Sequence, residues 1–346
     1  MWDYIHEQSD VLTNILIQEK KTISLLTNEY LDKQEVVITA SGSSLNAALI
    51  VKALLEKETS KRVTVESPFQ LRNYSTLLQN NPQDKVLIVL SQTGKSIGTL
   101  ECLQLAKDNH IPTLAITAYD DSPIATSAKL HINMLCGDEP VGPKTKGFTA
   151  TVLTLHILLM KMLQVKNHDQ TILEYRQSIL ELPSNIENAK SWCQKHNHWA
   201  KAQALSIVGF GVNHPTAREG ALKVLETMQI PVMNFEMEEF MHGPHRTIVP
   251  QSYLILIDMN GIGHELMNNF INFSKSKTEN CLVISTIDND DNENNIHIGD
   301  YPTIASWLNA VIPFQIMCTY FPEINGVNSS KPVYGDFATT VGTRIQ

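Results

Sequence analysis

Short runs of β-branched residues that alternate with helix-like segments limit the fold of this chain more than any other feature. Five such runs in the first half have the length and composition of buried strands: EVVITA, RVTVES, KVLIVL, TLAITA and LHINML. Parallel strands need crossover connections, which are usually helices, so this alternation is typical of a parallel sheet. The sequence therefore predicts an α/β fold.

The same order of elements repeats in the second half. A charged, helix-like stretch at 166–198, with ELPS as its only strong break, precedes five more runs: ALSIVGFG, VMNFEM, YLILID, CLVIST and NIHIG. In each half a strand, a glycine-containing turn and a helix follow one another, as in VITASGSSLNAALIVKALL and SIVGFGVNHPTAREGALKVL. We expect an N-terminal helical segment at 1–30, two similar α/β domains at 31–165 and 199–335, linker helices at 166–198 and a C-terminal tail at 336–346.

Three loops of the first half follow predicted strands, where ligands of open parallel sheets bind: ASGSSLN (40–46), SPFQ (67–70) and SQTGKS (91–96). The first and third combine hydroxyl groups with a glycine at a helix start, where free backbone N–H groups and the helix dipole favour an anion. We therefore expect a phosphorylated ligand. The alternative is that these hydroxyl groups are helix N-caps, namely those of Ser43, Ser44, Thr93 and Ser96.

The TGKS of the third loop does not fit a P-loop. That motif needs a glycine five positions before the glycine of its G-K-[ST] end, because the first glycine opens the turn around the phosphates. Five positions before Gly94 is Val89, which lies inside a predicted strand. The spacing therefore argues against an NTPase.

The charge balance argues against two classes of partner. The formal net charge is −9, whereas nucleic acids and anionic membranes bind surfaces rich in Lys and Arg. The start of the chain has no apolar signal segment, and the longest apolar stretch, FTATVLTLHILLMKML, is too short to span a bilayer. The five cysteines have no C-x-x-C spacing, which suits free thiols. We expect a cytoplasmic protein without nucleic-acid or membrane partners.

Five separated motifs resemble those of sugar-isomerase (SIS) domains and occur in the same order. GSS at 42–44, SQTG at 91–94 and VGPKTKGFTAT at 141–151 look like the SIS domain itself. EGALKVLE and FEMEEFMHGP, in the second half, are similar to the isomerase half of glucosamine-6-phosphate synthase. The resemblance covers both halves and implies two SIS domains, each a five-stranded parallel sheet flanked by helices.

The resemblance also implies roles for single residues. The cradle for the phosphate of a sugar 6-phosphate would consist of Ser44, Ser91, Gln92, Thr93 and Ser96, with Gly142 as a further substrate-binding residue. Glu219 and Lys223 would face the sugar, Lys223 with a catalytic role, and Glu226 would carry protons between C1 and C2. His242 would assist ring opening in the site of the neighbouring subunit, which implies a homodimer.

The residues themselves favour this interpretation. Glu219, Lys223 and Glu226 are spaced i, i+4, i+7, which places them on one helix face among mostly apolar residues. Such a charged stripe has to be paired or to face a cavity, and the alternative is an exposed Glu–Lys pair. His242 and His245 form an H-x-x-H, but no third ligand accompanies them at metal spacing. We therefore predict no metal and no other cofactor.

Two departures from the synthases narrow the expected chemistry. Those enzymes begin with a glutaminase domain whose cysteine nucleophile stands first, whereas this chain begins Met1-Trp2 and is not expected to draw ammonia from glutamine. They also place a lysine in the sugar site near the C-terminus, where this sequence has Thr339. Schiff-base ring opening is therefore not expected, and the chain resembles relatives that isomerise, deaminate or deglycate phosphosugars.

The leading hypothesis is a phosphosugar isomerase, deaminase or deglycase that acts on a hexose 6-phosphate or its amino or amine-adduct derivative. The alternative is a regulator that binds a phosphosugar without turning it over, as some SIS-containing proteins do. The presence of both Glu226 and His242 favours the enzyme.

Overall fold

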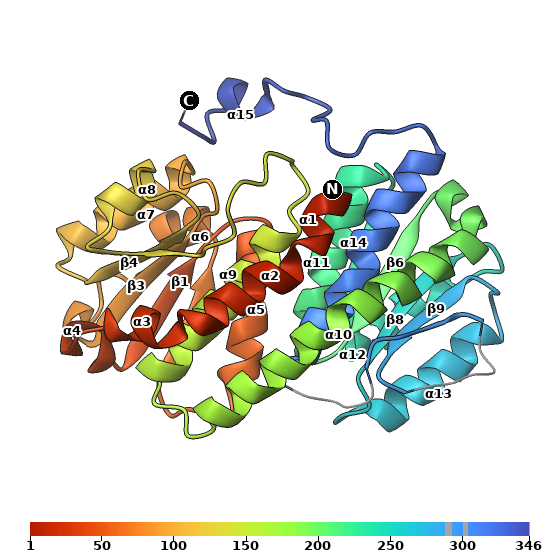
Figure 1. Cartoon of the computed structure of the whole chain (residues 1–346), viewed down its shortest axis with the longest axis horizontal. Coiled ribbons are helices and arrows are strands. Elements are labelled where there is room, and N and C mark those ends of the chain that lie inside the picture. Colours follow the sequence, from red (N-terminus) through yellow and green to blue (C-terminus); the bar gives the residue numbers. More distant parts are fainter. Residues whose placement is uncertain (288–292, 300–303, 346) are drawn as a thin grey trace. The chain divides into compact units, whose positions relative to one another are not determined.

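The computed structural model describes residues 1–287, 293–299 and 304–345 (Figure 1). The chain forms two compact units, each built around its own sheet. The first-sheet unit comprises Asp10–Pro140, Lys146–Gln170 and Pro332–Gln346, and the second-sheet unit comprises Met1–Ser9, Val141–Thr145 and Thr171–Lys331.

The first-sheet unit holds a five-stranded parallel sheet in the order β2-β1-β3-β4-β5. Each predicted run of the first half contains one strand: β1 (Glu35–Thr39), β2 (Arg62–Glu66), β3 (Lys85–Leu90), β4 (Thr113–Thr117) and β5 (Leu130–Asn133). Every residue of β1, β3 and β4 is buried, because helices cover both faces of the sheet. The predicted α/β class is confirmed.

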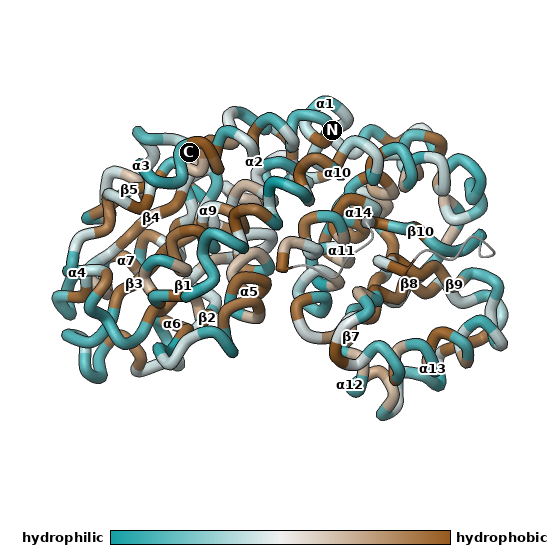
Figure 2. Tube along the Cα trace, turned by 60° about the horizontal axis from the view of Figure 1, so that its bottom comes forward, coloured by the Kyte–Doolittle hydropathy of each residue, from teal (hydrophilic) through white to brown (hydrophobic). Residues whose placement is uncertain are grey.

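The helices of this unit divide between the two faces of its sheet. α5 (Ser43–Leu55), which connects β1 to β2, packs beside α9 (Lys146–Met162). Right-handed connections place α6 (Pro68–Asn73), α7 (Ile97–Asp108) and α8 (Pro123–Ser127) on the opposite face. These three helices and the strands share one core cluster, to which they contribute Leu71, Cys102 and Ile124. Figure 2 shows this apolar interior as brown segments at the central strands.

The second-sheet unit repeats this architecture. Its strands are β6 (Leu205–Gly209), β7 (Val232–Glu236), β8 (Tyr253–Asp258), β9 (Cys281–Ser285) and β10 (Asn295–His297). The order β7-β6-β8-β9-β10 matches β2-β1-β3-β4-β5 strand for strand, which confirms the predicted similarity of the halves. α11 (Asn213–Thr227) packs beside α14 (Ser306–Ile324), while α12 (Met237–Met241) and α13 (His264–Lys275) place Phe240 and Met267 in the core cluster with β6, β8 and β9.

The N-terminal segment is helical up to Leu31. It consists of α1 (Trp2–His6), α2 (Gln8–Ile17), α3 (Glu19–Ser24) and α4 (Asn28–Leu31). The described tail contains one further helical turn, α15 (Phe337–Thr340). Elsewhere in the described chain, 3-10 turns occur at η1 (Pro82–Asp84), η2 (Asn197–Lys201) and η3 (Pro244–Thr247).

The predicted break at ELPS is wrong, because α10 runs from His168 to Lys195 through Pro183. A proline inside a helix removes one N–H donor and so one backbone hydrogen bond. The buried side chains of Leu182 and Ile186 anchor the helix on both sides of the proline. Tertiary packing therefore outweighs the local preference for a break.

Two further sequence predictions can be compared with the fold. The five cysteines are free, as predicted, and all of them are buried. The longest apolar stretch forms most of the buried helix α9. Among the helices of the described residues, none has the length and apolar character needed to cross a membrane.

Candidate functional site

The 91–96 loop joins the carboxyl end of β3 to the start of α7, at the sheet edge where ligands of parallel sheets bind. Ser91 is only 8% exposed, and within the described chain neither its hydroxyl group nor that of Thr93 has a hydrogen-bond partner. The backbone N–H groups of Thr93, Lys95 and Ser96 likewise lack an acceptor among the described residues. Hydroxyl and N–H groups that the protein leaves free in this way can bind a polar ligand, and the dipole of α7 favours an anion.

The alternative that these hydroxyl groups serve as N-caps is wrong for Ser43 and Ser44, whereas Ser96 occupies an N-cap position. The N-cap of α5 is Gly42, so Ser43 and Ser44 are the first two residues inside that helix. Ser96 is the N-cap of α7, but its side chain makes no capping hydrogen bond. β1 lies beside β3 in the sheet, so Ser44 and the 91–96 loop follow neighbouring strands at the same edge. Their hydroxyl groups are therefore not committed to capping either helix.

Gly94 fixes the path of this loop. Its φ of +65° lies in the left-handed region, and a Cβ atom there would come within 2.0 Å of Ser122 Oγ. Ser122 is itself held in place, because its Oγ donates to the carbonyl oxygen of Tyr119 (2.9 Å) and accepts from the N–H of Ala125 (3.3 Å) as the N-cap of α8. Only glycine fits at position 94 without moving the start of α8.

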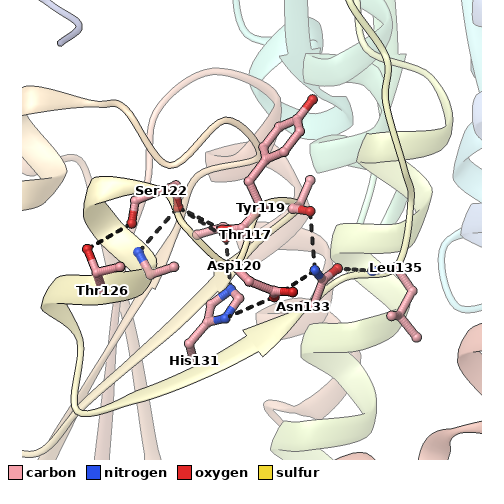
Figure 3. A network of polar contacts seen from close by, with 10 residues as sticks. Thr117, Tyr119, Asp120, Ser122, Thr126, His131, Asn133 and Leu135 are labelled. Carbon is pink, nitrogen blue, oxygen red and sulfur yellow. Dashed lines mark hydrogen bonds and ion pairs between the residues drawn. The ribbon is translucent and has the colours of Figure 1, made fainter.

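A network of polar side chains lies next to Ser122 and supports its position beside Gly94 (Figure 3). Thr117 Oγ1 lies 2.9 Å from His131 Nε2, and His131 Nδ1 lies 3.5 Å from a carboxylate oxygen of Asp120. Asn133 donates to the same Asp120 oxygen at 2.9 Å. Burial lowers the pKa of His131, and Asp120 opposes this effect only in part. The network therefore holds a neutral imidazole near pH 7 and links the ends of β4 and β5 to the 91–96 loop.

The side chain of Gln92 is fixed by a buried carboxylate that sequence reasoning missed. Glu139 is 1% exposed, and its Oε2 accepts from Gln92 Nε2 (3.1 Å) and from the N–H of Gly147 (3.0 Å) at the start of α9. A Cβ atom at Gly147 would lie 2.2 Å from Gln92 Nε2, so a side chain there would displace the amide group of Gln92. Glu139 lies in a loop, where no sequence pattern indicates that an acidic residue is buried.

The C-terminal tail runs beside the 91–96 loop within the first-sheet unit. Ser96 and Arg344 form an antiparallel β-bridge, in which Ile97 N donates to the carbonyl oxygen of Thr343 (3.2 Å). Ile345 N donates to the carbonyl oxygen of Lys95 at 3.0 Å. The first N–H group of α7 is therefore already occupied by the tail.

Gly142 and Thr339 were also singled out in the sequence. Gly142 belongs to the second-sheet unit, and a Cβ atom added to it would have no described atom within 4 Å. Thr339 lies in α15, where its Oγ1 donates to the carbonyl oxygen of Asp336 at 2.8 Å. A substrate role for Gly142 stays a prediction.

Glu219, Lys223 and Glu226 lie on one face of α11, as their spacing predicts. Lys223 Nζ is 2.6 Å from Glu226 Oε2 and 3.5 Å from Glu219 Oε1. The side chains of Lys223 and Glu219 are each 1% exposed, whereas that of Glu226 is 33% exposed. The alternative of an exposed Glu–Lys pair is therefore wrong, and Glu226 is the member of the cluster that solvent or a ligand reaches.

Lys223 stays charged although it is buried. Burial by itself lowers the pKa of its ammonium group, but Glu219 and Glu226 more than compensate and raise the pKa above its ordinary value. A protonated lysine is not a nucleophile. In this structure Lys223 is therefore suited to orient the Glu226 carboxylate and not to form a covalent bond with a sugar.

His242 is exposed at the end of α12. Its Nδ1 lies 2.8 Å from the carbonyl oxygen of Glu238, which leaves Nε2 without a partner among the described residues. His245 Nδ1 accepts from the N–H of Gly243 at 3.4 Å. In the described part of the chain, no group of three or more His, Cys, Asp or Glu residues is placed to hold a metal ion.

Comparison with known proteins agrees with this architecture. Residues 29–161 match the family profile of the SIS domain. The chain is 27% identical over 295 residues to a glutamine–fructose-6-phosphate aminotransferase (isomerizing) of Campylobacter jejuni, covering 83% of this chain and 48% of that protein. The chain thus spans about half the length of the curated relatives it matches.

Solved structures share the fold over nearly the whole chain. A proposed phosphosugar isomerase of Clostridium difficile superimposes with a TM-score of 0.91 at 24% identity, covering 99% of this chain and 98% of the other. The glucosamine-6-phosphate deaminase of Thermotoga maritima gives a TM-score of 0.79 at 17% identity, covering 96% and 95% of the two chains. These likenesses show the paired-sheet fold.

Proposed function

We propose, on the premise that this chain is an SIS-domain protein, that it is an enzyme acting on a hexose 6-phosphate or its amino or amine-adduct derivative. The observation that carries the proposal is Glu226, a partly exposed carboxylate held by a buried ammonium group. A carboxylate held in this way can act as a base toward a bound sugar, which an isomerase needs and a binding protein does not. The names of the relatives, which include an aminotransferase and a deaminase of sugar phosphates, support this substrate class.

The proposed reaction is a proton transfer between neighbouring carbons of the open-chain sugar. Glu226 removes a proton from the carbon next to the carbonyl or imine carbon, and the same carboxyl group returns a proton to the other carbon. The hydroxyl proton of the carbon that loses its hydrogen passes to the carbonyl oxygen of its neighbour through the intermediate enediol, so an aldose and a ketose interconvert without an external oxidant. Where an amine is attached to the sugar, the product is an imine, which water hydrolyses to a carbonyl compound and the free amine.

A panel of hexose 6-phosphates and their amine adducts tests this function. Thermal shift reports binding, and product analysis reports turnover of the same mixtures. Product from at least one phosphorylated member supports the enzyme. Tight binding without product across the panel would instead favour a phosphosugar-binding regulator, and the absence of both would contradict the substrate class.

The 91–96 loop is proposed to hold the phosphate group. Replacing Ser91 and Thr93 together by Ala is expected to weaken binding of a hexose 6-phosphate at least about tenfold, because hydrogen bonds to a charged group contribute about 1.5–3 kcal/mol each. Calorimetric titration measures the loss. The control is the double variant Ser60→Ala, Thr76→Ala, which removes two exposed hydroxyl groups of the same unit. Equal affinity of the first variant and wild type would place the phosphate elsewhere.

We further propose a homodimer in which His242 acts in the site of the neighbouring copy. A 1:1 mixture of Glu226→Gln and His242→Ala variants is then expected to recover about a quarter of wild-type activity, because about half of the dimers are hybrids and each hybrid contains one site with both residues. Subunit exchange is verified by mass spectrometry of tagged copies. If exchange occurs and activity does not return, Glu226 and His242 act within one copy.

The cellular setting of this enzyme is proposed to be the cytoplasm, without nucleic-acid partners. Five free buried thiols suit a reducing compartment. The net charge of −9 disfavours binding to nucleic acids.

A further inference from the structure

The β-bridge between the tail and the 91–96 loop places two side chains together. Its two hydrogen bonds flank Ser96 and Arg344, so these residues form a non-hydrogen-bonded antiparallel pair. In such a pair the Cα atoms are about 4.5 Å apart, and the side chains leave the same face of the ribbon. The side chain of Arg344 therefore starts beside the hydroxyl group of Ser96.

The same geometry turns the backbone of Ser96 away from the tail. At a non-hydrogen-bonded position, the N–H and C=O groups of each residue face away from the partner strand. The carbonyl oxygen of Ser96 accepts from Leu100 N (3.1 Å), while its N–H has no acceptor in the described chain. This N–H therefore remains available to a ligand, and so does the hydroxyl group of Ser91, which has no hydrogen-bond partner among the described residues.

Arg344 carries a charge that no carboxylate of the described residues neutralises. It forms no ion pair with any of them, and the same holds for Lys95 in the loop. The chain as a whole has a net charge of −9, so two such cations at one loop are a local exception. A guanidinium group matches the geometry of a phosphate group, to which it can donate two parallel hydrogen bonds.

We propose that Arg344 binds the phosphate group of the sugar held by the 91–96 loop, and so completes the phosphate site from the C-terminal tail. The inference rests on the proposed function, because it assigns a further ligand to the same phosphate group. Ser91, Thr93 and the loop N–H groups hold the oxygen atoms, while Arg344 supplies the positive charge that hydroxyl and amide groups lack.

The test compares two variants of Arg344 with fructose 6-phosphate and inorganic phosphate as probes. Arg344→Met keeps a long apolar side chain and removes the charge. Arg344→Lys keeps the charge but cannot donate the two parallel hydrogen bonds of a guanidinium group. We expect Arg344→Met to bind both probes roughly ten- to a hundredfold more weakly than wild type, the scale of hydrogen bonds to a charged group. Arg344→Lys is expected to recover part of this loss. Arg176→Met, which removes an exposed arginine of α10, is the matched control and is expected to bind like wild type.

Three outcomes separate the inference from the function on which it rests. A loss in Arg344→Met that Arg344→Lys partly restores supports the assignment. Wild-type affinity in Arg344→Met, together with weak binding by Ser91→Ala, Thr93→Ala, overturns the role of Arg344 and leaves the phosphate loop in place. If wild type itself binds neither probe nor any phosphorylated member of the panel, the proposed function fails, and the role of Arg344 fails with it.

Discussion

Replacing Glu226 by Gln is expected to lower turnover by roughly two orders of magnitude or more, the scale typical of removing a general base. Gln has nearly the same size as Glu and still hydrogen-bonds to Lys223, but its amide cannot accept a proton from carbon near neutral pH. Affinity for the phosphosugar is therefore expected to change little. The measurement is kcat and KM for the substrate that the panel identifies, with Glu187→Gln on the exposed face of α10 as the control.

Solvent deuterium provides a second measurement of the same step. Wild type is expected to introduce deuterium at C1 or C2 of a bound sugar phosphate even where net reaction is slow, because the proton on Glu226 exchanges with water between its removal and its return. The Glu226→Gln variant is expected to introduce no deuterium into the sugar phosphate. Exchange at an equal rate in both proteins would show that another group carries the proton.

Replacing Lys223 by Met is expected to have the largest effect on stability. The substitution removes the cation that pairs with Glu219 and leaves that carboxylate buried without it. Removing one partner of a buried ion pair destabilises proteins by about 3–5 kcal/mol, because the remaining charge is not compensated. Chemical denaturation of wild type and variant measures the change in the free energy of unfolding.

A double-variant cycle identifies the cause of that loss. If an uncompensated Glu219 carboxylate is responsible, the double variant Glu219→Gln, Lys223→Met is expected to be more stable than Lys223→Met alone, since the buried charge is gone. Lys195→Met, at the exposed end of α10, is the control for removing a lysine and is expected to change the free energy of unfolding by less than about 0.5 kcal/mol. A loss below about 1 kcal/mol in Lys223→Met would contradict the buried-pair interpretation.

Local patterns in the sequence determine the elements of this fold. β-Branched runs such as KVLIVL form strands because their side chains favour an extended backbone and both of their faces are buried. The repeated strand, turn and helix give two sheets with the same order of strands. The spacing of Glu219, Lys223 and Glu226 places them on one face of α11, because a helix has 3.6 residues per turn.

The same local patterns failed where distant residues decide the outcome. Pro183 suggests a break, yet α10 continues because its apolar face is buried on both sides of the proline. Ser43 and Ser44 have the composition of N-caps, but Gly42 ends the preceding turn and takes the cap position. A proline inside a helix costs about 3 kcal/mol, which packing of a whole helix exceeds.

The sequence by itself thus determined the α/β class, the repeated halves, the loop after β3 and the shared face of the charged residues of α11, since each depends on neighbours along the chain. Only the tertiary structure decided which charges are buried and which polar groups lack partners. Lys223 is enclosed while Glu226 reaches the surface, Glu139 holds Gln92 from 47 positions away, and Arg344 lies beside Ser96. Burial and hydrogen bonding between distant segments depend on how strands and helices pack, and no periodicity along the chain encodes these contacts.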